Sequence, residues 1–252
     1  MYAFISDIHG NTGALAAVFE DIRARSVDKV FCLGDVIGYG PEPRECLQTV
    51  MENCEICLLG NHEHGSMYYA SDFNPKARAA IEWTKDELNS KEYAREENFK
   101  LWNYISEMPE SHTVGEILLV HGSPQDPVRE YLLPGDAKDE AKMAGCFSKM
   151  GASRVCFVGH SHVPGVYVDG RGFQSPSDVQ GEYALDDNKT IINIGSVGQP
   201  RDGDTRASYV SFDEKARIVR FHRLAYDVEA TMAKLRATEL PEYLADRLGV
   251  GR

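Results

Sequence analysis

The feature that most constrains the fold is the alternation of short apolar runs with helical segments at the start of the chain. Residues 3–6 (AFIS) predict a buried strand, and the next segment carries apolar residues at helical spacing, Leu15, Val18, Phe19 and Ile22. Apolar runs return at residues 29–33 and 55–59, with a helical stretch around 42–52 between them. This order predicts a βαβαβ unit, whose strands form a parallel sheet.

A charged segment follows, from about residue 66 to residue 109, with KDELNSKEYAREENFK at its middle. Its apolar residues predict two helices; they are Ile81, Trp83, Leu88, Phe99, Leu101 and Trp102. We expect these helices to lie over the main body as a cap insertion. An ordinary pair of flanking helices is the alternative.

The second half of the chain predicts more strands and fewer helices. Two buried strands, 117–120 and 154–158, enclose a helical stretch at 136–150. Four later runs lie close together with turn residues between them, which favours antiparallel strands in a second sheet; they are 165–168, 190–194, 207–212 and 216–224. A helix over 227–237 follows. With no internal repeat, we expect a single domain, residues 1–252.

Charge and composition exclude several classes of protein. The formal net charge is −12 and no basic stripe is present, which argues against a nucleic-acid-binding surface. No apolar run approaches the roughly 18 residues that a membrane span needs. The chain enters its first predicted strand without a signal region, and its six cysteines are scattered, with a single C-x-x-C at Cys54 and Cys57. We therefore expect a cytoplasmic protein without a structural zinc site.

Polar residues of metal-ligand type follow five of the predicted strands. They are Asp7 and His9, then Asp35, then Asn61 and His62, then His121, and finally His160 and His162. In an open parallel sheet, ligands bind outside the carboxyl ends of the strands, so these groups are expected to meet in one place. Each has an ordinary alternative, such as a helix cap for Asp7 or a turn for Asn61. Those alternatives would have to hold independently at all five strand ends.

Two other histidines do not follow this pattern. His112 is predicted to lie in a polar loop and His222 in a charged strand, and we assign both a structural role.

Five motifs in order carry a resemblance to a known family. They are D-x-H (Asp7, His9), G-D (Gly34, Asp35), G-N-H-E (Gly60 to Glu63), the isolated His121 and G-H-x-H (Gly159 to His162). Together they resemble the calcineurin-like metallophosphoesterase superfamily. Four longer segments are similar to the small stand-alone prokaryotic phosphodiesterase branch of this superfamily; they are DIHGN, GDVIGYGP, HGSP and NIGSVGQPR. The resemblance implies an α/β fold, a four-layer α/β/β/α sandwich of two mixed sheets flanked by helices.

The resemblance also implies two divalent transition-metal ions, for which the nitrogen and oxygen ligands suit Mn, Fe, Zn, Co or Ni. One metal would be held by Asp7, His9, Asp35 and His162, and the other by Asp35, Asn61, His121 and His160. Asp35 would bridge them. His62 would donate a proton to the leaving group or help to hold the transition state. Asp35 and His62 are thus the candidate catalytic residues, and Asn61, Arg201 and Arg206 the candidate substrate-binding residues, with an exposed loop as the alternative for both arginines.

One departure from the family pattern bears on the substrate. Protein Ser/Thr phosphatases and symmetrical dinucleoside-tetraphosphate hydrolases carry G-D-x-x-D-R-G, whereas this chain has GDVIGYG, with Gly38 and Tyr39 in place of Asp and Arg. The carboxylate that would orient His62 and the arginine that would grip the phosphate are missing from those positions. Arg201, Arg206 or Arg129 would have to replace that cation.

The expected function is therefore hydrolysis of a small phosphodiester, a nucleotide or an organic diester, by attack of a metal-bound hydroxide. The first alternative is a phosphomonoesterase or protein phosphatase with the same metal centre. The second is a non-catalytic scaffold on the same fold. Scaffolds of that kind lose metal ligands, whereas every ligand of the motifs is present here.

Overall fold

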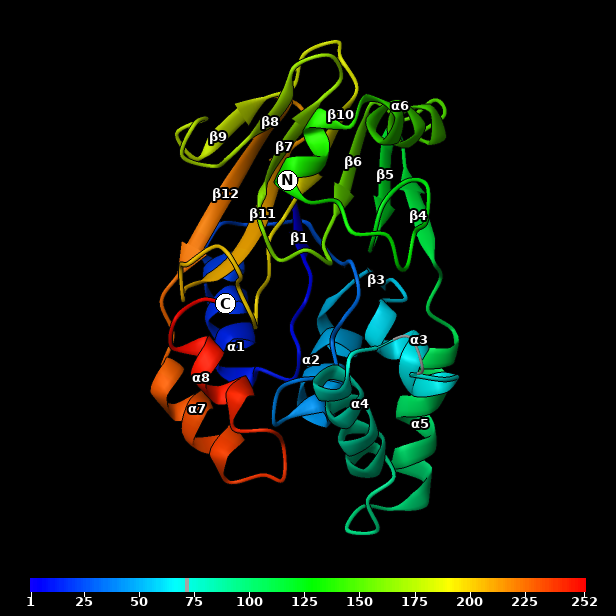
Figure 1. Ribbon diagram of the computed structural model, residues 1–252, viewed down its shortest axis with the longest axis vertical. Helices are drawn as coiled ribbons and strands as arrows, with labels where there is room; N and C mark the ends of the chain where they lie inside the picture. Colours follow the sequence, from blue (N-terminus) through cyan, green and yellow to red (C-terminus); the bar gives the residue numbers. More distant parts are fainter. Residues whose placement is uncertain (71–72) are drawn as a thin grey trace.

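Two six-stranded sheets pack against each other in the computed structural model, which describes residues 1–70 and 73–252 (Figure 1). The first sheet has, in spatial order, β3 (Ile56–Cys57), β2 (Lys29–Cys32), β1 (Tyr2–Ile5), β11 (Ala207–Asp213), β12 (Ile218–Leu224) and β9 (Glu182–Ala184). The second has β4 (Ser111–Val114), β5 (Ile117–Val120), β6 (Val155–Val158), β10 (Thr190–Asn193), β7 (Gly165–Val168) and β8 (Gly172–Gln174).

The predicted βαβαβ unit is confirmed. β1, β2 and β3 run parallel, and the helices between them are α1 (Thr12–Ala24) and α2 (Pro43–Asn53). The apolar face of α1 that the spacing predicts is buried, and its side chains are Leu15, Val18, Phe19 and Ile22. Asn11 caps this helix, because its side-chain oxygen accepts a hydrogen bond from the Ala14 amide at 3.1 Å.

Three apolar clusters separate four layers of structure. The one between the sheets includes Phe4 and Phe157, whose ring centroids stack 3.9 Å apart. A second lies between the first sheet and helices α1 and α2, and a third lies between the second sheet and α6 (Glu140–Lys149). The order helix, sheet, sheet, helix is the four-layer α/β/β/α sandwich expected from the sequence, which confirms the fold class.

The assignment of the later strands to one antiparallel second sheet was wrong. β11 and β12 belong to the first sheet, where β11 pairs with β1 in antiparallel orientation. β10 runs parallel to β6 in the second sheet and antiparallel to β7. Short connections indicate which strands follow one another, but not which sheet each joins. His112 also lies in β4 rather than in a loop.

The charged segment at 66–109 contains the two predicted helices, α4 (Pro75–Leu88) and α5 (Arg95–Ser106), after a short helix α3 (Asn61–Met67). Leu88, Leu101 and Ile105 join the same apolar cluster as α1 and α2, so the segment extends the outer helical layer. At its other end, α4 places Ala77 and Ala80 against Tyr39 and the C-terminal helices. Its role as a cap over a site stays a prediction.

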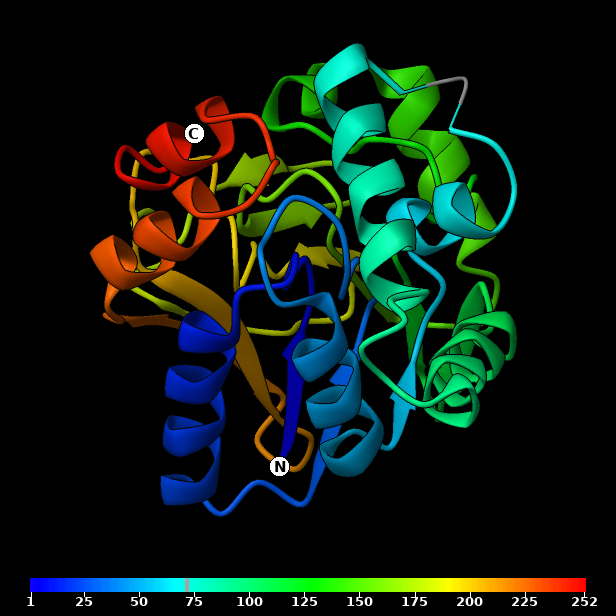
Figure 2. The ribbon, with the colours of Figure 1, turned by 90° about the horizontal axis from the view of Figure 1, so that it is seen from below.

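The C-terminal helices are α7 (Val228–Arg236) and α8 (Tyr243–Leu248), of which only the first was expected. Figure 2 shows them on one side of the loop that follows β2, with α4 on the other side. A 3₁₀ turn at Pro134–Lys138 leads into α6. Across the described residues, every helix is too short or too polar for a membrane crossing.

Candidate metal centre

The polar residues that follow the strands meet at the carboxyl ends of these strands, but they come from both sheets. β1, β2 and β3 of the first sheet supply Asp7, His9, Asp35 and Asn61, and β5 and β6 of the second supply His121, His160 and His162. The expectation that a single open parallel sheet supplies all these residues was therefore wrong. The sheets approach so closely here that the His160 amide donates a 2.9 Å hydrogen bond to Asp7 Oδ2. All seven residues are buried.

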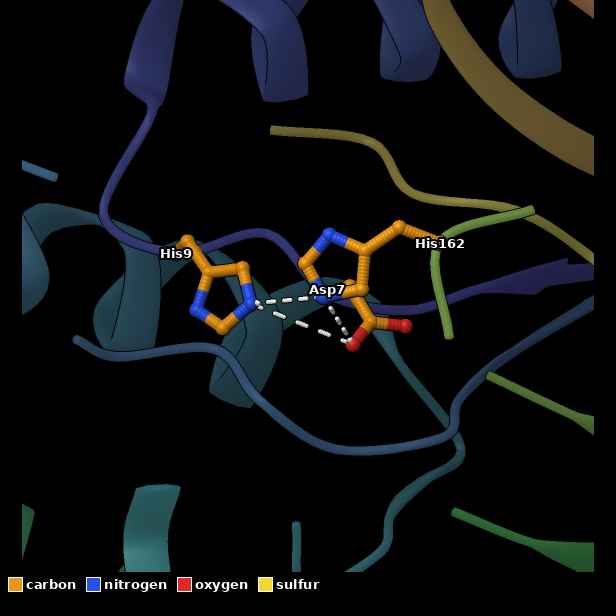
Figure 3. Close-up of side chains that lie close together, drawn as sticks. All are labelled: Asp7, His9 and His162. Atoms are coloured by element: carbon orange, nitrogen blue, oxygen red, sulfur yellow. Dashed lines mark hydrogen bonds and ion pairs between the residues drawn. The ribbon is translucent and has the colours of Figure 1, made fainter. Parts of the chain in front are cut away.

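The first group of ligand atoms lies on Asp7, His9 and His162 (Figure 3). His162 Nε2 is 3.1 Å from Asp7 Oδ1, and His9 Nε2 is 3.9 Å from the same oxygen. The two imidazoles face each other with their Nε2 atoms 3.2 Å apart. Two nitrogens and one oxygen therefore converge on a small common volume.

The second group lies on Asn61, His121 and His160, beside Asp35. His121 Nε2 is 3.0 Å from Asn61 Oδ1 and 3.2 Å from His160 Nδ1. Asp35 stands between the two groups, because its Oδ2 is 3.4 Å from His121 Nε2 and 3.7 Å from His9 Nε2. The geometry has the form required of a bridging carboxylate.

Hydrogen bonds to the backbone fix which ring nitrogens face the centre. His9 Nδ1 lies 3.0 Å from the Ile37 carbonyl oxygen, and His162 Nδ1 lies 2.5 Å from that of Gln199. His121 Nδ1 is 2.9 Å from the Leu33 oxygen, and His160 Nε2 is 3.1 Å from the Arg129 oxygen. Because a carbonyl only accepts, each of these nitrogens carries a proton, and in the neutral ring the opposite nitrogen offers a lone pair.

The residues therefore fit divalent cations. Neutral rings would point lone pairs at each other across 3.2 Å in both His9–His162 and His121–His160, an arrangement that a cation between them makes favourable. Asp7 Oδ1, which faces the first group, is buried without a hydrogen-bond partner. Backbone acceptors behind the histidines and an orphaned carboxylate oxygen are typical of a metal site.

The backbone around the centre is strained. Asp7, His9, Asp35, His160 and His162 have φ between 49° and 63°, in the left-handed region that non-glycine residues rarely occupy. Such conformations persist only where surrounding contacts hold them, and they concentrate at functional sites.

Glu63 provides part of that support by binding the backbone of the loop at residues 35–37. Its carboxylate accepts hydrogen bonds from the amides of Asp35, Val36, Ile37 and Gly60 at 2.8–3.1 Å. A side chain at position 60 would meet Asp35 Oδ1 at 2.2 Å, so only glycine lets the two loops approach. Burial and the nearby Asp35 raise the pKa of Glu63 to about 7. The G-N-H-E motif contained Glu63, but the sequence analysis gave it no role.

Electrostatics differ sharply among the buried groups. Burial would raise the pKa of Asp35, but the imidazoles of His121 and His62 outweigh it and hold this pKa well below its usual value. Burial lowers the pKa of His160 to about 3. For His121, burial disfavours the protonated ring, but the Asp35 carboxylate stabilises it and raises the pKa of His121 to about 9. A cation would compete with that proton, because only the neutral ring is a ligand.

His62 lies next to His9 and Asp35 and belongs to neither of the two ligand groups described above. One of its ring nitrogens is within 4.8 Å of ligand atoms of His9 and Asp35, and its ring packs against Tyr39 with centroids 4.4 Å apart. Its Nδ1 is buried without a partner. Burial lowers the pKa of His62 to about 4, so the ring is neutral near pH 7.

The three candidate arginines have different surroundings. Arg201 lies 5.8 Å from the centroid of the Tyr39 ring and donates to Gln199 Oε1 at 2.9 Å. Arg129 lines a cavity at the centre and lies 3.0 Å from His64 Nδ1. Arg206 pairs with Asp204 at 2.7 Å, and its side chain is 53% exposed. The structure brings Arg201 and Arg129 to the site and does not bring Arg206 there.

A cavity of about 360 Å³ opens at the second group of ligands. It is lined by Tyr39, Asn61, Phe73, Asn74, Ala77, Arg129, Tyr131 and His160. Tyr131 stacks on His160 with centroids 3.7 Å apart, a contact that the sequence gave no means of predicting. The volume and the aromatic walls are typical of a site for a small organic ligand.

The remaining predicted residues are placed as follows. His222 bonds to Ser211 Oγ at 2.7 Å, far along β12, and His112 stacks on Phe31 at 6.4 Å, which agrees with structural roles for both. The cysteines are all free, and no group of possible metal ligands among residues 1–70 and 73–252 includes Cys54 or Cys57.

Comparison with known proteins decides the family. The family model described as calcineurin-like phosphoesterase matches residues 2–192. The chain belongs to the calcineurin-like phosphoesterase family. Members of this family use divalent metal ions, and the clustered histidines and aspartates of this phosphoesterase are the groups that could bind them.

Similar proteins span the whole chain. An uncharacterized protein of Methanocaldococcus jannaschii is 38% identical over 258 residues, which cover 100% of this phosphoesterase and 98% of that protein. The crystal structure of a metallophosphoesterase from Sphaerobacter thermophilus matches with a TM-score of 0.84 and 37% identity, covering 100% and 98% of the two chains. A hypothetical protein from Pyrococcus horikoshii, with 18% identity, a TM-score of 0.76 and coverage of 100% and 99%, shares the fold.

Proposed function

We propose that this phosphoesterase hydrolyses small phosphodiesters, with a nucleotide or an organic diester as substrate. Asp7, His9, Asp35 and His162 would hold one divalent cation, and Asp35, Asn61, His121 and His160 the other. When bound, such a pair polarises the phosphoryl oxygens and lowers the pKa of a water molecule, so that a nucleophile is available near neutral pH. A transition metal such as Mn, Fe, Zn, Co or Ni suits this ligand set.

The side chains around the cation sites would orient the ester. The Asn61 amide would bind the phosphoryl oxygens at the cation pair, and Arg201 would bind anionic oxygens of the substrate beside the Tyr39 ring. The cavity beside His160 would take one ester group between the Tyr39 and Tyr131 rings. His62 would face the leaving-group oxygen and donate a hydrogen bond or a proton to it as the P–O bond breaks. The ring is neutral near pH 7, so in that form it donates a hydrogen bond from its protonated nitrogen, whereas transfer of a proton to the leaving group requires the imidazolium.

The observation that carries the diester proposal is the surroundings of Tyr39. Its phenol ring packs against His9, with centroids 4.8 Å apart, and against His62. Tyr39 stands where the G-D-x-x-D-R-G motif of protein Ser/Thr phosphatases and symmetrical dinucleoside-tetraphosphate hydrolases has an arginine. A diester has one negative charge at phosphorus and a monoester up to two. An aromatic ring in place of a cation therefore penalises the monoester more.

One observation favours a phosphomonoesterase as the second candidate. The Arg201 guanidinium lies over the same Tyr39 ring, so a cation from another loop stands near the place of the missing arginine. If it contacts the transferred phosphoryl group, Arg201 would compensate for the substitution at position 39.

The test compares two substrates with the same leaving group, bis(p-nitrophenyl) phosphate and p-nitrophenyl phosphate. We expect the metal-loaded protein to prefer the diester by at least about tenfold in kcat/KM, or about 1.4 kcal/mol in transition-state stabilisation. Arg206→Ala serves as a control, because it removes a cation of the same loop that is paired with Asp204. A preference for the monoester that is lost in Arg201→Ala and kept in Arg206→Ala would establish the second candidate instead.

A further inference from the structure

A second arginine, from the far end of the chain, stands beside Arg201. Arg247 belongs to α8, and its guanidinium carbon lies 5.9 Å from the centroid of the Tyr39 ring, while that of Arg201 lies 5.8 Å from it. Tyr39 itself packs on His9 and His62 of the metal centre. Two guanidinium groups are thus held at one ring next to the site.

Neither arginine is neutralised by an acidic side chain. Within the described ranges, 1–70 and 73–252, no aspartate or glutamate lies within ion-pair distance of Arg201 or Arg247, whereas the partly buried Arg223 pairs with Asp202. Arg201 Nε is buried without a hydrogen-bond partner. Adjacent partly buried cations repel each other, and an anion between them removes that cost.

The fold holds Arg247 in place. Its Nε donates to the Arg252 carbonyl oxygen, and its guanidinium lies between the rings of Tyr39 and Tyr243, 5.5 Å from the second centroid. Leu244 and Leu248 of the same helix pack into the apolar cluster that contains Tyr39 and Ala77. Burial and the neighbouring Arg201 lower the pKa of Arg247, the direction expected for a partly buried cation beside a second cation.

We propose that Arg201 and Arg247 form a second anion-binding subsite, which takes a further phosphate group of the substrate. This inference rests on the proposed diester hydrolysis. The scissile phosphate would lie at the metal centre and the second phosphate at the two arginines, with Tyr39 between the two positions. The forked donors of arginine match phosphate oxygens, and among the described residues no acidic side chain occupies the donors of either guanidinium. The substrate class is therefore a phosphodiester that carries a second phosphate, such as a phosphorylated nucleotide.

A matched pair of substrates tests the subsite. Both are p-nitrophenyl esters of thymidine 5′-phosphate, and only one has a 3′-phosphate. We expect the second phosphate to raise kcat/KM of the wild type by about tenfold, mainly through a lower KM, because a charge-assisted contact would stabilise the bound substrate. In Arg247→Met this ratio should fall toward one. Arg236→Met, which removes an exposed arginine paired with Asp246 on the neighbouring helix, should keep the wild-type ratio.

Three outcomes would overturn the subsite: a wild type indifferent to the 3′-phosphate, a preference that survives in Arg247→Met, or an equal loss in Arg236→Met. Arg247→Lys is a second variant for the case that Arg247→Met lowers the melting temperature. Because lysine keeps the charge but not the forked donors, Arg247→Lys should retain only part of the preference. Full retention of the preference in Arg247→Lys would contradict the proposal.

A binding measurement separates this inference from the proposed function. Titration calorimetry on the metal-loaded protein with butylphosphonate and butane-1,4-bisphosphonate, neither of which can be hydrolysed, should show tighter binding of the bisphosphonate, and this advantage should be lost in Arg247→Met. If neither thymidine ester is hydrolysed, the diesterase proposal fails, and the subsite is then judged by calorimetry alone. Equal affinities for the two phosphonates would overturn it.

Discussion

The α-carbon of Gly38 lies so close to the His62 ring that a Cβ built on it would come within 2.1 Å of Nδ1. The same nitrogen is buried without a partner, and Gly38 stands at the aspartate position of the G-D-x-x-D-R-G pattern. This chain thus departs from that pattern at Gly38 and Tyr39, both of which lie against the His62 ring. Packing against Gly38 and Tyr39, rather than a hydrogen bond to a carboxylate, holds the His62 ring in place.

Gly38→Ala is expected to displace the His62 ring. Rate should fall by about 10- to 100-fold, because a misplaced catalytic group is costly, while metal content stays unchanged. Gly170→Ala is the matched control: both glycines have positive φ, 84° and 74°, but nothing lies within 4 Å of a Cβ at Gly170. Equal activity in the two variants would show that contact with Gly38 does not position His62.

His62→Ala should lower the rate of diester hydrolysis by about 10²- to 10⁴-fold, the range of general acid–base catalysis. If His62 protonates the leaving group, the loss should shrink for an activated nitrophenolate, which departs without a proton, and should be full for an alkyl alkoxide. The measurement is kcat for a series of diesters that differ only in the leaving group. An equal loss across the series would exclude the acid role and leave hydrogen bonding in the transition state.

His222 should make stability depend on pH. Burial and nearby Arg25 lower its pKa to about 4, below the value near 6.5 of the unfolded chain. Between these values the unfolded state binds more protons, so the contribution is fully present above about pH 6.5 and is lost as pH falls toward 4. In metal-free protein, the drop in melting temperature from pH 7 to pH 5 should exceed that of His222→Gln by about 2–4 °C.

The control for this experiment is His112→Gln, which removes a histidine from the other sheet. It should retain the wild-type pH dependence. The same drop in wild type and His222→Gln would show that this histidine does not contribute.

The metal centre could be predicted because its signal is local. Each candidate ligand follows an apolar run, and chain order alone places it at a strand end. Sheet membership could not be predicted in this way: β11 pairs with β1 across two hundred residues of sequence, and nothing in the run 207–212 identifies that partner. The ligands converge nevertheless, because the strands of both sheets end at the same edge.

The residues around the metal centre were harder to find. Tyr131 and Arg247 reach the site from loops and helices far away in sequence, and neither lies in a motif. The short helix α8 has six residues, too few for periodicity to identify. The positive φ values of Asp7, His9 and Asp35 also have no signature in residue type, because tertiary contacts impose them.

Asp35 is the residue on which the dinuclear account depends, since its Oδ2 lies near histidines of both groups. In Asp35→Asn we expect metal content at both sites to fall together, with hydrolysis abolished. His162→Ala should mainly affect the first group, to which its Nε2 belongs. Elemental analysis of purified, reconstituted protein distinguishes these patterns, and full occupancy of two metals in Asp35→Asn would refute the bridging role.

The most direct measurement is a titration of metal-free protein with Mn²⁺ while hydrolysis of bis(p-nitrophenyl) phosphate is followed. Two cation sites that share Asp35 and act together predict a low rate until the second equivalent binds, and then a plateau at two equivalents per chain. A full rate at one equivalent, or hydrolysis that does not depend on added metal, would contradict a dinuclear phosphodiesterase.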